Sequence, residues 1–228
     1  NQTEVDAYNA QAKQYSGNQD AVYYKGLRPG DMRYQDLNKD GVINDEDKTM
    51  IGKPQPDFEL GLALNAEYKG VYVDINMSGK FGQQVMRSYR LFADKYKQNH
   101  TTEVFGRWHG EGTSNRLPRL SANSHEWNDN MMSDRYMYNT SYLRINNLTI
   151  GYNFSELCKK INHIEGARIY CSMQNLATIT KYDGMDPDVA YWGNDGQKWA
   201  SGIDLGLYPL PRTVMFGVNV TFGATSKK

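Results

Sequence analysis

The chain has 228 residues, which is enough for one domain with a hydrophobic core. Its 26 Lys and Arg residues equal its 26 Asp and Glu residues, so no net charge attracts it to nucleic acid or to anionic lipid. No stretch reaches the roughly 18 consecutive apolar residues that a transmembrane helix needs. A mean hydropathy of −0.74 still fits a membrane β-barrel, since only alternate residues of its strands face lipid.

The first feature along the chain is an acidic loop over residues 36–47 with the spacing of an EF-hand calcium loop. Side-chain oxygens stand at its first, third, fifth and last positions, and Gly41 provides the sharp turn between them. Oxygen atoms are the ligands that Ca²⁺ prefers. We therefore expect one structural Ca²⁺ here, and the alternative is an acidic turn without metal. The expected ligands are Asp36, Asn38, Asp40, the carbonyl of Val42 and Asp47.

Strict alternation of apolar and polar residues then predicts a β-hairpin. The two runs are residues 58–68 and 71–80, and Lys69 and Gly70 form the tight turn between them. Each run has about 10 residues, the length of a strand that crosses a bilayer at a tilt. The apolar faces consist of Phe58, Leu60, Leu62, Leu64, Ala66 and Tyr68 in the first run and Val71, Val73, Ile75 and Met77 in the second.

Three further strands are expected over residues 141–154, 167–176 and 213–222. In the first of them the apolar parity switches at Asn146 and Asn147, which predicts a β-bulge because one inserted residue inverts the alternation. Before these strands, apolar residues at helical spacing predict a short helix over 84–97. The fold class expected from these patterns is all-β, with antiparallel strands.

The connections between the strands alternate in length. They are short at 69–70 and near 155–165, and long at 82–138 and 179–211, so the long ones share one end of the sheet. Outer-membrane barrels have this arrangement, with short periplasmic turns and long external loops. Five strands cannot close a barrel. The remaining strands are therefore expected to precede residue 1.

Motifs of known enzyme classes are absent from the sequence. The four histidines have no zinc-ligand spacing and no nucleophile elbow is present. The long loops do carry aromatic residues, which stack on sugars or peptides in some proteins and pack loops together in others. The sequence does not choose between these roles, and it assigns no substrate-binding residue. The loop aromatics are Trp108, Trp127, Tyr191, Trp192, Trp199 and Tyr208.

Several short stretches, in family order, resemble the SusC-like (SusC/RagA) family of TonB-dependent transporters. The resemblance spans nearly all of residues 26–222. It is carried by PGDMRYQDLNKDGVI at 29–43, IGKPQP at 51–56, RWHGEGTSNR at 107–116, SYLRINNLTIGY at 141–152, QNL at 174–176, DPD at 186–188 and YPLPR at 208–212.

The resemblance implies the C-terminal portion of a 22-stranded barrel in the outer membrane of Gram-negative bacteria. In that family a plug and TonB gate the barrel, a SusD-like surface lipoprotein caps it, and oligosaccharides or peptides are imported. The chain would then comprise an extracellular loop region at 1–57, the last five strands within 58–222, and a tail at 223–228. The tail departs from the family pattern, in which the aromatic residue of the last strand, here Phe222, ends the chain.

A second function from a different class fits the same patterns, namely a secreted, calcium-stabilised β-sandwich that binds glycans. The two alternatives place the apolar strand faces differently. A barrel directs Leu60, Leu62 and Val73 toward lipid, whereas a sandwich buries them between two sheets. Neither alternative is an enzyme.

Overall fold

The computed structural model describes residues 1–90, 99–121, 128, 131–158, 163–188 and 202–223. The chain divides into two compact units. The first unit is Asn1–Gly52 with Arg87–Met137, and the second is Lys53–Met86 with Tyr138–Lys228. No helix in the described part of the chain has both the length and the apolar character that crossing a membrane requires.

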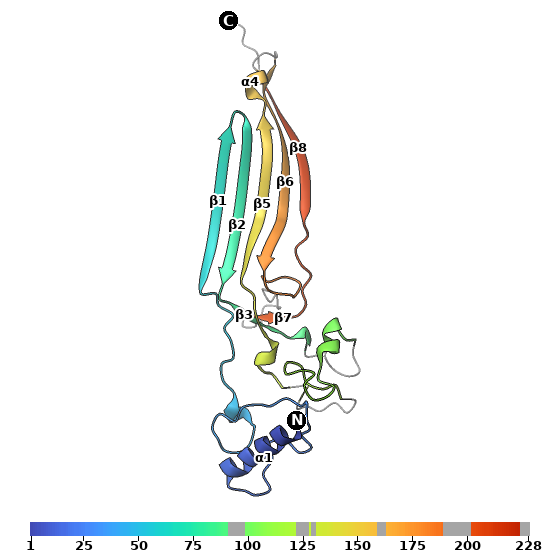
Figure 1. Ribbon diagram of the computed structural model, residues 1–228. Coiled ribbons are helices and arrows are strands. Elements are labelled where there is room, and N and C mark those ends of the chain that lie inside the picture. Colours follow the sequence, from blue (N-terminus) through green and yellow to red (C-terminus); the bar gives the residue numbers. More distant parts are fainter. Residues whose placement is uncertain (91–98, 122–127, 129–130, 159–162, 189–201, 224–228) are drawn as a thin grey trace. The chain divides into compact units, whose positions relative to one another are not determined.

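The first unit begins with a helix, α1, over Gln2–Ser16 (Figure 1). Its start is fixed by a capping box. The Asn1 side chain accepts from the backbone N–H of Glu4, and the Glu4 carboxylate accepts from the backbone nitrogen of Asn1. It ends at Gly17, which has the left-handed φ of 68° that glycine adopts without strain. The family resemblance implies a loop region at 1–57, and the structure adds the helix α1 within it.

The core of the first unit is small and rich in tyrosine. Tyr8 and Ala12 on the buried face of α1 pack with Tyr23, and the two rings lie 4.3 Å apart between centroids. The Tyr8 hydroxyl donates to the carbonyl of Tyr34 at 2.5 Å. Among its described residues the unit also contains three short 3₁₀ helices, Asp45–Asp47, Thr102–Gly106 and Asp134–Tyr136, and helical residues at Tyr89, Arg90 and Asn128.

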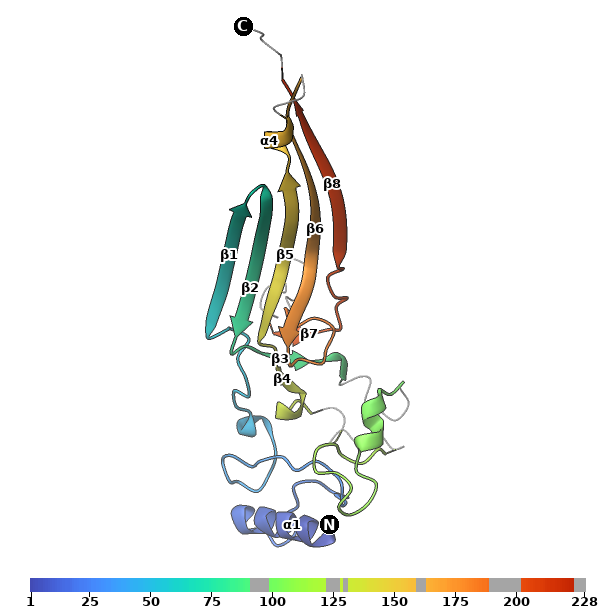
Figure 2. The ribbon, with the colours of Figure 1, turned by 45° about the horizontal axis from the view of Figure 1, so that its top comes forward.

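The second unit contains a five-stranded antiparallel sheet in the order β1-β2-β5-β6-β8 (Figure 1, Figure 2). Neighbours in the sheet follow one another along the sheet-forming parts of the chain, as expected for an antiparallel meander. A short helix, α4 (Ser155–Cys158), follows β5. The strands are β1 (Phe58–Tyr68), β2 (Val71–Phe81), β5 (Tyr142–Asn153), β6 (Ile164–Thr180) and β8 (Thr213–Phe222).

The turn between β1 and β2 has two residues, as the sequence predicts. Lys69 has a φ of 49° and Gly70 a φ of 87°, and Tyr68 pairs directly with Val71. Positive φ at both central positions is the geometry that matches the twist of the flanking strands. The hairpin register is therefore fixed from this turn to Phe58 and Phe81, whose rings stack at 4.6 Å.

A smaller three-stranded sheet has the order β4-β3-β7. Its strands are β3 (Gln84–Arg87), β4 (Met137–Asn139) and β7 (Ile203–Asp204). The helix expected over 84–97 is wrong at its first residues, because Gln84 and Met86 donate backbone hydrogen bonds to Lys53 and Gly202 instead. Tyr89 and Arg90 are helical, and residues 91–97 of the expected helix lie outside the described residues.

The bulge expected in β5 is present. Asn147 pairs with Asn76 and Ile145 pairs with Met77, so Asn146 is the inserted residue that lies opposite no residue of β2 in the strand register. On the other side the irregularity is larger, because Gln174 faces Asn147 and the next paired residue of β6 is Ala177, opposite Ile145. β6 extends to Thr180 rather than ending at 176 as predicted, since this second irregularity inverts the parity and hides the continuing alternation.

Candidate functional site

The expected calcium loop is closed by hydrogen bonds that centre on its first residue, Asp36. Its carboxylate accepts from the backbone N–H groups of Lys39 (2.6 Å) and Gly41 (2.9 Å) and from the hydroxyl of Tyr23 (2.9 Å). The side chain of Asp36 therefore ties the loop to the tyrosine core of the first unit. Burial, followed by the hydrogen bond to Asp36, raises the pKa of the Tyr23 hydroxyl, so this proton stays in place at neutral pH.

The last residue of the loop, Asp47, closes it from the other end. One carboxylate oxygen accepts from the backbone N–H of Leu37 (2.7 Å), and the other accepts from that of Asn44 (2.9 Å). Asn44 in turn caps the 3₁₀ helix Asp45–Asp47 by accepting from the N–H of Glu46. The first and last expected ligands are thus held in one ring of backbone contacts.

Gly41 fits the loop against α1 for two reasons. It has a φ of 85°, and a Cβ at this position would lie 2.6 Å from the carbonyl oxygen of Ala12. Any other residue would be strained and would also displace the loop from the helix. The loop spacing predicts a glycine at position 41 for the sharp turn. The structure shows a second reason for it, namely the close approach of the loop to α1.

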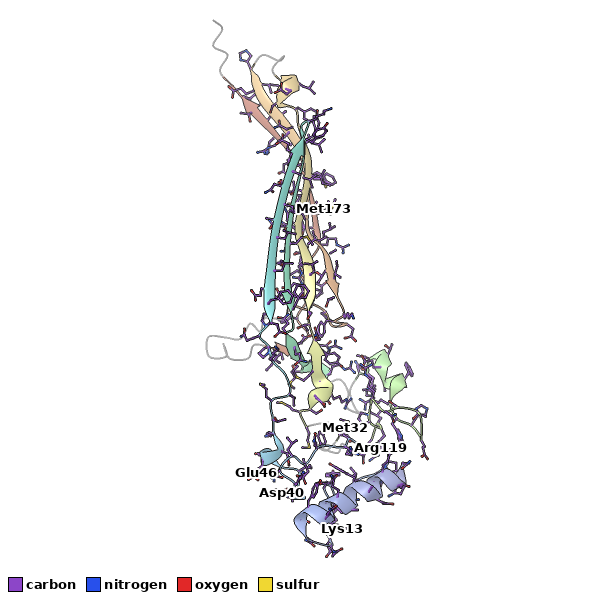
Figure 3. All side chains as sticks on the ribbon, turned by 60° about the vertical axis from the view of Figure 1, so that its left-hand side comes forward. Lys13, Met32, Asp40, Glu46, Arg119 and Met173 are labelled. Atoms are coloured by element: carbon purple, nitrogen blue, oxygen red, sulfur yellow. The ribbon has the colours of Figure 1, made fainter. Side chains whose placement is uncertain are left out.

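The middle ligands lie on the exposed side of the loop, where Figure 3 labels Asp40 and Glu46. The Asn38 amide donates to both of these carboxylates at 3.0 Å, and Asp40 accepts from the N–H of Val42 at 2.8 Å. These hydrogen bonds, that from Val42 first, lower the pKa of Asp40. Within the described ranges, no three His, Cys, Asp or Glu side chains are grouped closely enough to hold a metal as they stand. The oxygen donors themselves are of the type that fits Ca²⁺.

A buried clasp joins segments of the first unit that are far apart in sequence. Arg119, which Figure 3 labels, donates to both carboxylate oxygens of Asp31, at 2.6 and 3.3 Å, and the Asn128 amide donates to one of them at 2.6 Å. The Asp31 side chain is 3% exposed. Beside it, the Trp108 ring lies against Gly30, and Arg119 N–H donates to the Gly30 carbonyl. The motif residues Gly30, Asp31 and Trp108 therefore have a structural role.

A second clasp holds the end of the sheet that carries the long connections. Asp186 pairs with Arg144 of β5 at 2.5 Å, and Asp188 pairs with Lys80 of β2 at 2.9 Å. Arg144 also donates to the hydroxyl of Thr178 in β6. The DPD motif at 186–188 thus bridges β5 and β2 on the polar face, and Arg144 connects this pair to β6. Sequence reading did not single out Arg144, because its partners come from residues that are remote in sequence.

On the same polar face, tyrosines and glycines alternate along one row across the sheet. Tyr72 pairs with Gly151, Gly151 with Tyr170, and Tyr170 with Gly217. A Cβ at Gly151 would lie 2.4 Å from the Tyr72 ring, and one at Gly217 would lie 2.2 Å from the Tyr170 ring. Each tyrosine ring therefore occupies the space that a side chain at the neighbouring glycine would need.

The opposite face of the sheet is apolar and exposed. Phe216 is 83% exposed and Val218 is 68% exposed, although both lie in the middle of β8. Exposed apolar faces of this size mark a surface that contacts something other than water. The exposed apolar side chains on this face are Phe58, Leu60, Leu62, Leu64, Val71, Ile150, Ile169, Val214, Phe216, Val218, Val220 and Phe222.

A pocket of about 330 Å³ lies beside the end of β6. One wall is formed by residues 175–180 of β6, and another by residues 209–212, which lead into β8. Arg144 and Asp186 of the second clasp also line it. Arg212 and Leu210 are exposed at this site, and the sequence patterns indicated neither of them as a site residue.

The loop aromatics have different fates. Trp108 packs on Gly30 and so belongs to the clasp of the first unit. Tyr208 is 88% exposed. Trp127, Tyr191, Trp192 and Trp199 lie outside the described residues.

No protein-family model matches the chain. Individual relatives do match. The chain is 31% identical over 196 residues to the TonB-dependent receptor P3 of Formosa agariphila, a match that covers 85% of this chain and 19% of the relative. It is 29% identical over 202 residues to the TonB-dependent receptor SusC of Bacteroides thetaiotaomicron, which covers 88% of this chain and 18% of that protein. The chain thus spans about a fifth of the length of the curated relatives it matches.

Solved structures with a similar fold include the RagAB peptide importer. In its closed-closed state the TM-score is 0.62 at 23% identity, covering 84% of this chain and 20% of the importer chain. In its open-open state the TM-score is 0.57 at 24% identity, covering 74% and 17%. At this identity the likeness to the importer concerns the fold alone. Membership of the family rests on the relatives found by sequence. Over most of its length, the chain is homologous to a portion of the TonB-dependent receptors of the SusC/RagA type, which are transporters and not enzymes.

Proposed function

We propose that the chain forms five strands of a 22-stranded outer-membrane barrel that imports oligosaccharides or peptides. The single observation that supports this most is the exposed apolar face of the sheet, with Phe216 and Val218 as its most exposed mid-strand residues. Apolar side chains of this kind are stable when they face hydrocarbon. The opposite, polar face then lines the lumen, which is the face that carries the Tyr–Gly row and the second clasp.

The two outer strands support a larger barrel. Every residue of β1 is exposed, on both faces, and β8 has an equally bare edge. In hydrocarbon each unpaired backbone group costs several kcal/mol (about 2–7). We infer that the other strands of the receptor pair with β1 and β8 and close the sheet.

The sandwich alternative is disfavoured by the same face. A sandwich buries the inner side chains of both sheets to make its core. Here Leu60 and Leu64 are 43% and 50% exposed, and no second layer covers them within the part of the chain that the structure describes. The relatives named above are TonB-dependent receptors, which also favours the barrel.

The partners of the whole receptor follow from its relatives and are part of the proposal. We infer that a SusD-like surface lipoprotein covers the external side and that TonB contacts another part of the receptor. The likeness to the RagAB peptide importer favours peptides, and the likeness to the SusC receptor leaves oligosaccharides as the second cargo class.

Orientation follows from the connections. Lys69 and Gly70 connect β1 and β2, and residues 154–163 connect β5 and β6, so these short turns share one end. We propose that this end is periplasmic and that the long segments 82–141 and 181–212 are external. Protease added to intact cells should cut the long segments and leave 154–163 whole. Cutting in 154–163 from outside would contradict the orientation.

The import function is tested in cells that produce the whole receptor. Deletion of residues 213–222 should prevent insertion into the outer membrane, because β6 then loses its partner strand. A cell-surface label on the external loops and heat-dependent gel mobility report insertion, and uptake of a labelled oligopeptide pool reports transport. A folded, detergent-free receptor in the periplasm would sink the barrel proposal.

We also propose that loop 36–47 binds one Ca²⁺ through Asp36, Asn38, Asp40, the carbonyl of Val42 and Asp47. The donor spacing and the loop closure around Asp36 support this, and the ion would be structural. Calorimetric titration of the whole receptor with Ca²⁺ tests it, with Asp40→Ala and the outlying Asp20→Ala as a matched pair. The site would be rejected if Asp40→Ala released the same heat of Ca²⁺ binding as Asp20→Ala, or if neither variant released any.

A further inference from the structure

One edge of β6 is only partly paired. Along one side, β5 pairs with β6 as far as Thr180. Along the other side, β8 pairs with β6 only from Ile164 to Gln174 (Figure 1). Residues 177–180 therefore have β5 on one side and, among the described residues, no strand on the other. A strand edge of this kind presents unpaired N–H and C=O groups, which an extended chain pairs with.

The gap beside this edge is built by the sequence before β8. Pro209 and Pro211 have no backbone N–H, so this segment cannot continue the ladder that β8 makes with β6. The Asn175 side chain, on a residue with a φ of 51°, donates to the carbonyl of Pro211 at 3.0 Å and holds the segment at this point. The chain from 205 to 211 consequently leaves the edge, and the pocket of about 330 Å³ occupies the space between them.

The pocket carries a cation that is available to a ligand. Arg144, on its floor, is already neutralised by Asp186 and bonded to Thr178. Arg212 lines the same pocket, is exposed, and has no hydrogen bond or ion pair to any other described residue. Leu210, also on the wall, is 58% exposed. The site therefore combines a strand edge, a guanidinium without an ion-pair partner among the described residues, and an apolar contact.

We propose that the edge of β6 at 177–180 docks an extended peptide that pairs its backbone with the strand and its carboxylate with Arg212. This deepens the proposed import function, on which it rests, by naming peptide as the cargo class and this edge as one of its contacts. The apolar side chains of the peptide would contact Leu210. Since the edge lies at the end of the sheet with the long connections, the contact is made on the proposed external side.

A peptide fits this site better than an oligosaccharide. The edge repeats its donors and acceptors at every second residue, which is the spacing of another β-strand. Sugars are usually held by an exposed aromatic ring. Tyr182 is the aromatic residue among those that line the pocket, and it is 7% exposed, with its hydroxyl donating to Asp204. Its ring offers no face for stacking.

The test uses the whole receptor, purified in detergent, and the fluorescently labelled pentapeptide Thr-Val-Thr-Val-Glu as the probe. Binding is measured by fluorescence anisotropy. Only every second amide of a docked strand faces its partner. N-methylation of one alternate set of probe amides should therefore abolish binding, whereas methylation of the other set should leave it nearly unchanged. Equal binding of both methylated probes would overturn the pairing.

The charge contact is tested by Arg212→Gln with Arg168→Gln as its control. Arg168 lies on β6, as the proposed edge does, but in the part of β6 that pairs with β8, where it is opposite Asn219. Loss of one charge-assisted hydrogen bond should weaken the probe about tenfold in Arg212→Gln. Arg168→Gln should bind like the unchanged receptor. A probe with its carboxylates converted to amides should not distinguish Arg212→Gln from the unchanged receptor, and an equal loss with that probe would reject the contact.

The outcomes separate this inference from the proposed function. Receptor that takes up peptide in cells but binds both methylated probes equally would refute the β6 edge and keep the importer. Receptor that binds the probe as expected but neither reaches the outer membrane nor takes up peptide would refute the importer and keep the edge. Binding of fluorescently labelled maltoheptaose, with no binding of the pentapeptide, would replace peptide by glycan at this site and overturn the inference.

Discussion

The Trp108 ring lies so close to Gly30 that a Cβ at residue 30 would fall 2.3 Å from the indole. Gly30 also has a φ of 86°. Gly30→Ala therefore combines backbone strain with a clash, and we expect it to destabilise the first unit by about 2–4 kcal/mol. The temperature at which a protease begins to cut this unit in the whole receptor measures the loss.

Gly26→Ala is the matched control for that substitution. Gly26 has a φ of 89°, but nothing lies within 4 Å of the position its Cβ would take. It should therefore lose only the backbone part, about 1–2 kcal/mol. If both substitutions shift the cutting temperature equally, the contact between Trp108 and Gly30 contributes nothing.

The Asp31–Arg119 pair leads to a second prediction. The Asp31 side chain is 3% exposed and that of Arg119 is 16% exposed, so Arg119→Met leaves a buried carboxylate without its main partner. Removal of one partner of a buried pair costs about 3–5 kcal/mol, and the retained Asn128 bond places this pair at the lower end. Lys48→Met is the control, because its pair with Asp45 is 77% and 91% exposed and should contribute almost nothing. Equal protease sensitivity in the two variants would show that the clasp is not a stabilising element.

The row of tyrosines and glycines gives a third prediction, about sheet assembly. Gly217→Ala should reduce the folded fraction of the receptor by heat-dependent gel mobility, since the new methyl group would sit inside the Tyr170 ring. The expected loss is about 1–3 kcal/mol. Tyr170→Ala in the same protein should restore part of it, and Gly61→Ala, where nothing lies within 4 Å, should have no such effect. No recovery in the double variant would mean that the ring is not the cause.

The two faces of β8 allow a fourth prediction in the membrane. Val218 and Asn219 are neighbours in sequence and point to opposite faces of the sheet. Val218→Lys should cost about 2–4 kcal/mol if residue 218 lies near the bilayer midplane, whereas Asn219→Lys should be tolerated in the lumen. Unfolding by guanidinium in lipid vesicles measures both. A larger loss for Asn219→Lys would reverse the assignment of the faces.

The sequence predicts this sheet well where one physical signal acts alone. In β1, β2 and β8, successive side chains alternate between the apolar and the polar face of the sheet. The strand bounds expected from this alternation therefore agree with the observed bounds within one residue. It fails at β6, because Asn175 adopts a left-handed φ and the unpaired residues around it invert the parity. Pairing with β5 resumes at Ala177 and continues β6 beyond this irregularity. Such pairing between strands cannot be seen in the sequence of one strand alone.

The helix α1 and the clasps illustrate two other limits. The capping box of Asn1 and Glu4 and the closing Gly17 were readable signals for α1, but its apolar stripe is short and its neighbours are polar. The clasps were not readable, because Asp31 and Arg119 are 88 residues apart and only the fold brings them together. The Ca²⁺ ligands that the spacing of loop 36–47 indicates stay a prediction, and the structure adds the closure of the loop around Asp36.

The fifth prediction concerns the pH dependence of the proposed Ca²⁺ site. The N–H of Val42, then the amide of Asn38, lower the pKa of Asp40 below that of a free aspartate. A group with a lowered pKa stays ionised above that pKa, and its contribution is lost as the pH falls through it. Ca²⁺ affinity should therefore be unchanged between pH 7 and pH 5 and should fall only below about pH 4, where aspartates protonate. Calorimetry of the whole receptor at these pH values measures this. Asp40→Asn should be weak at every pH, and an affinity that already falls between pH 7 and pH 5 would point to histidine ligands instead.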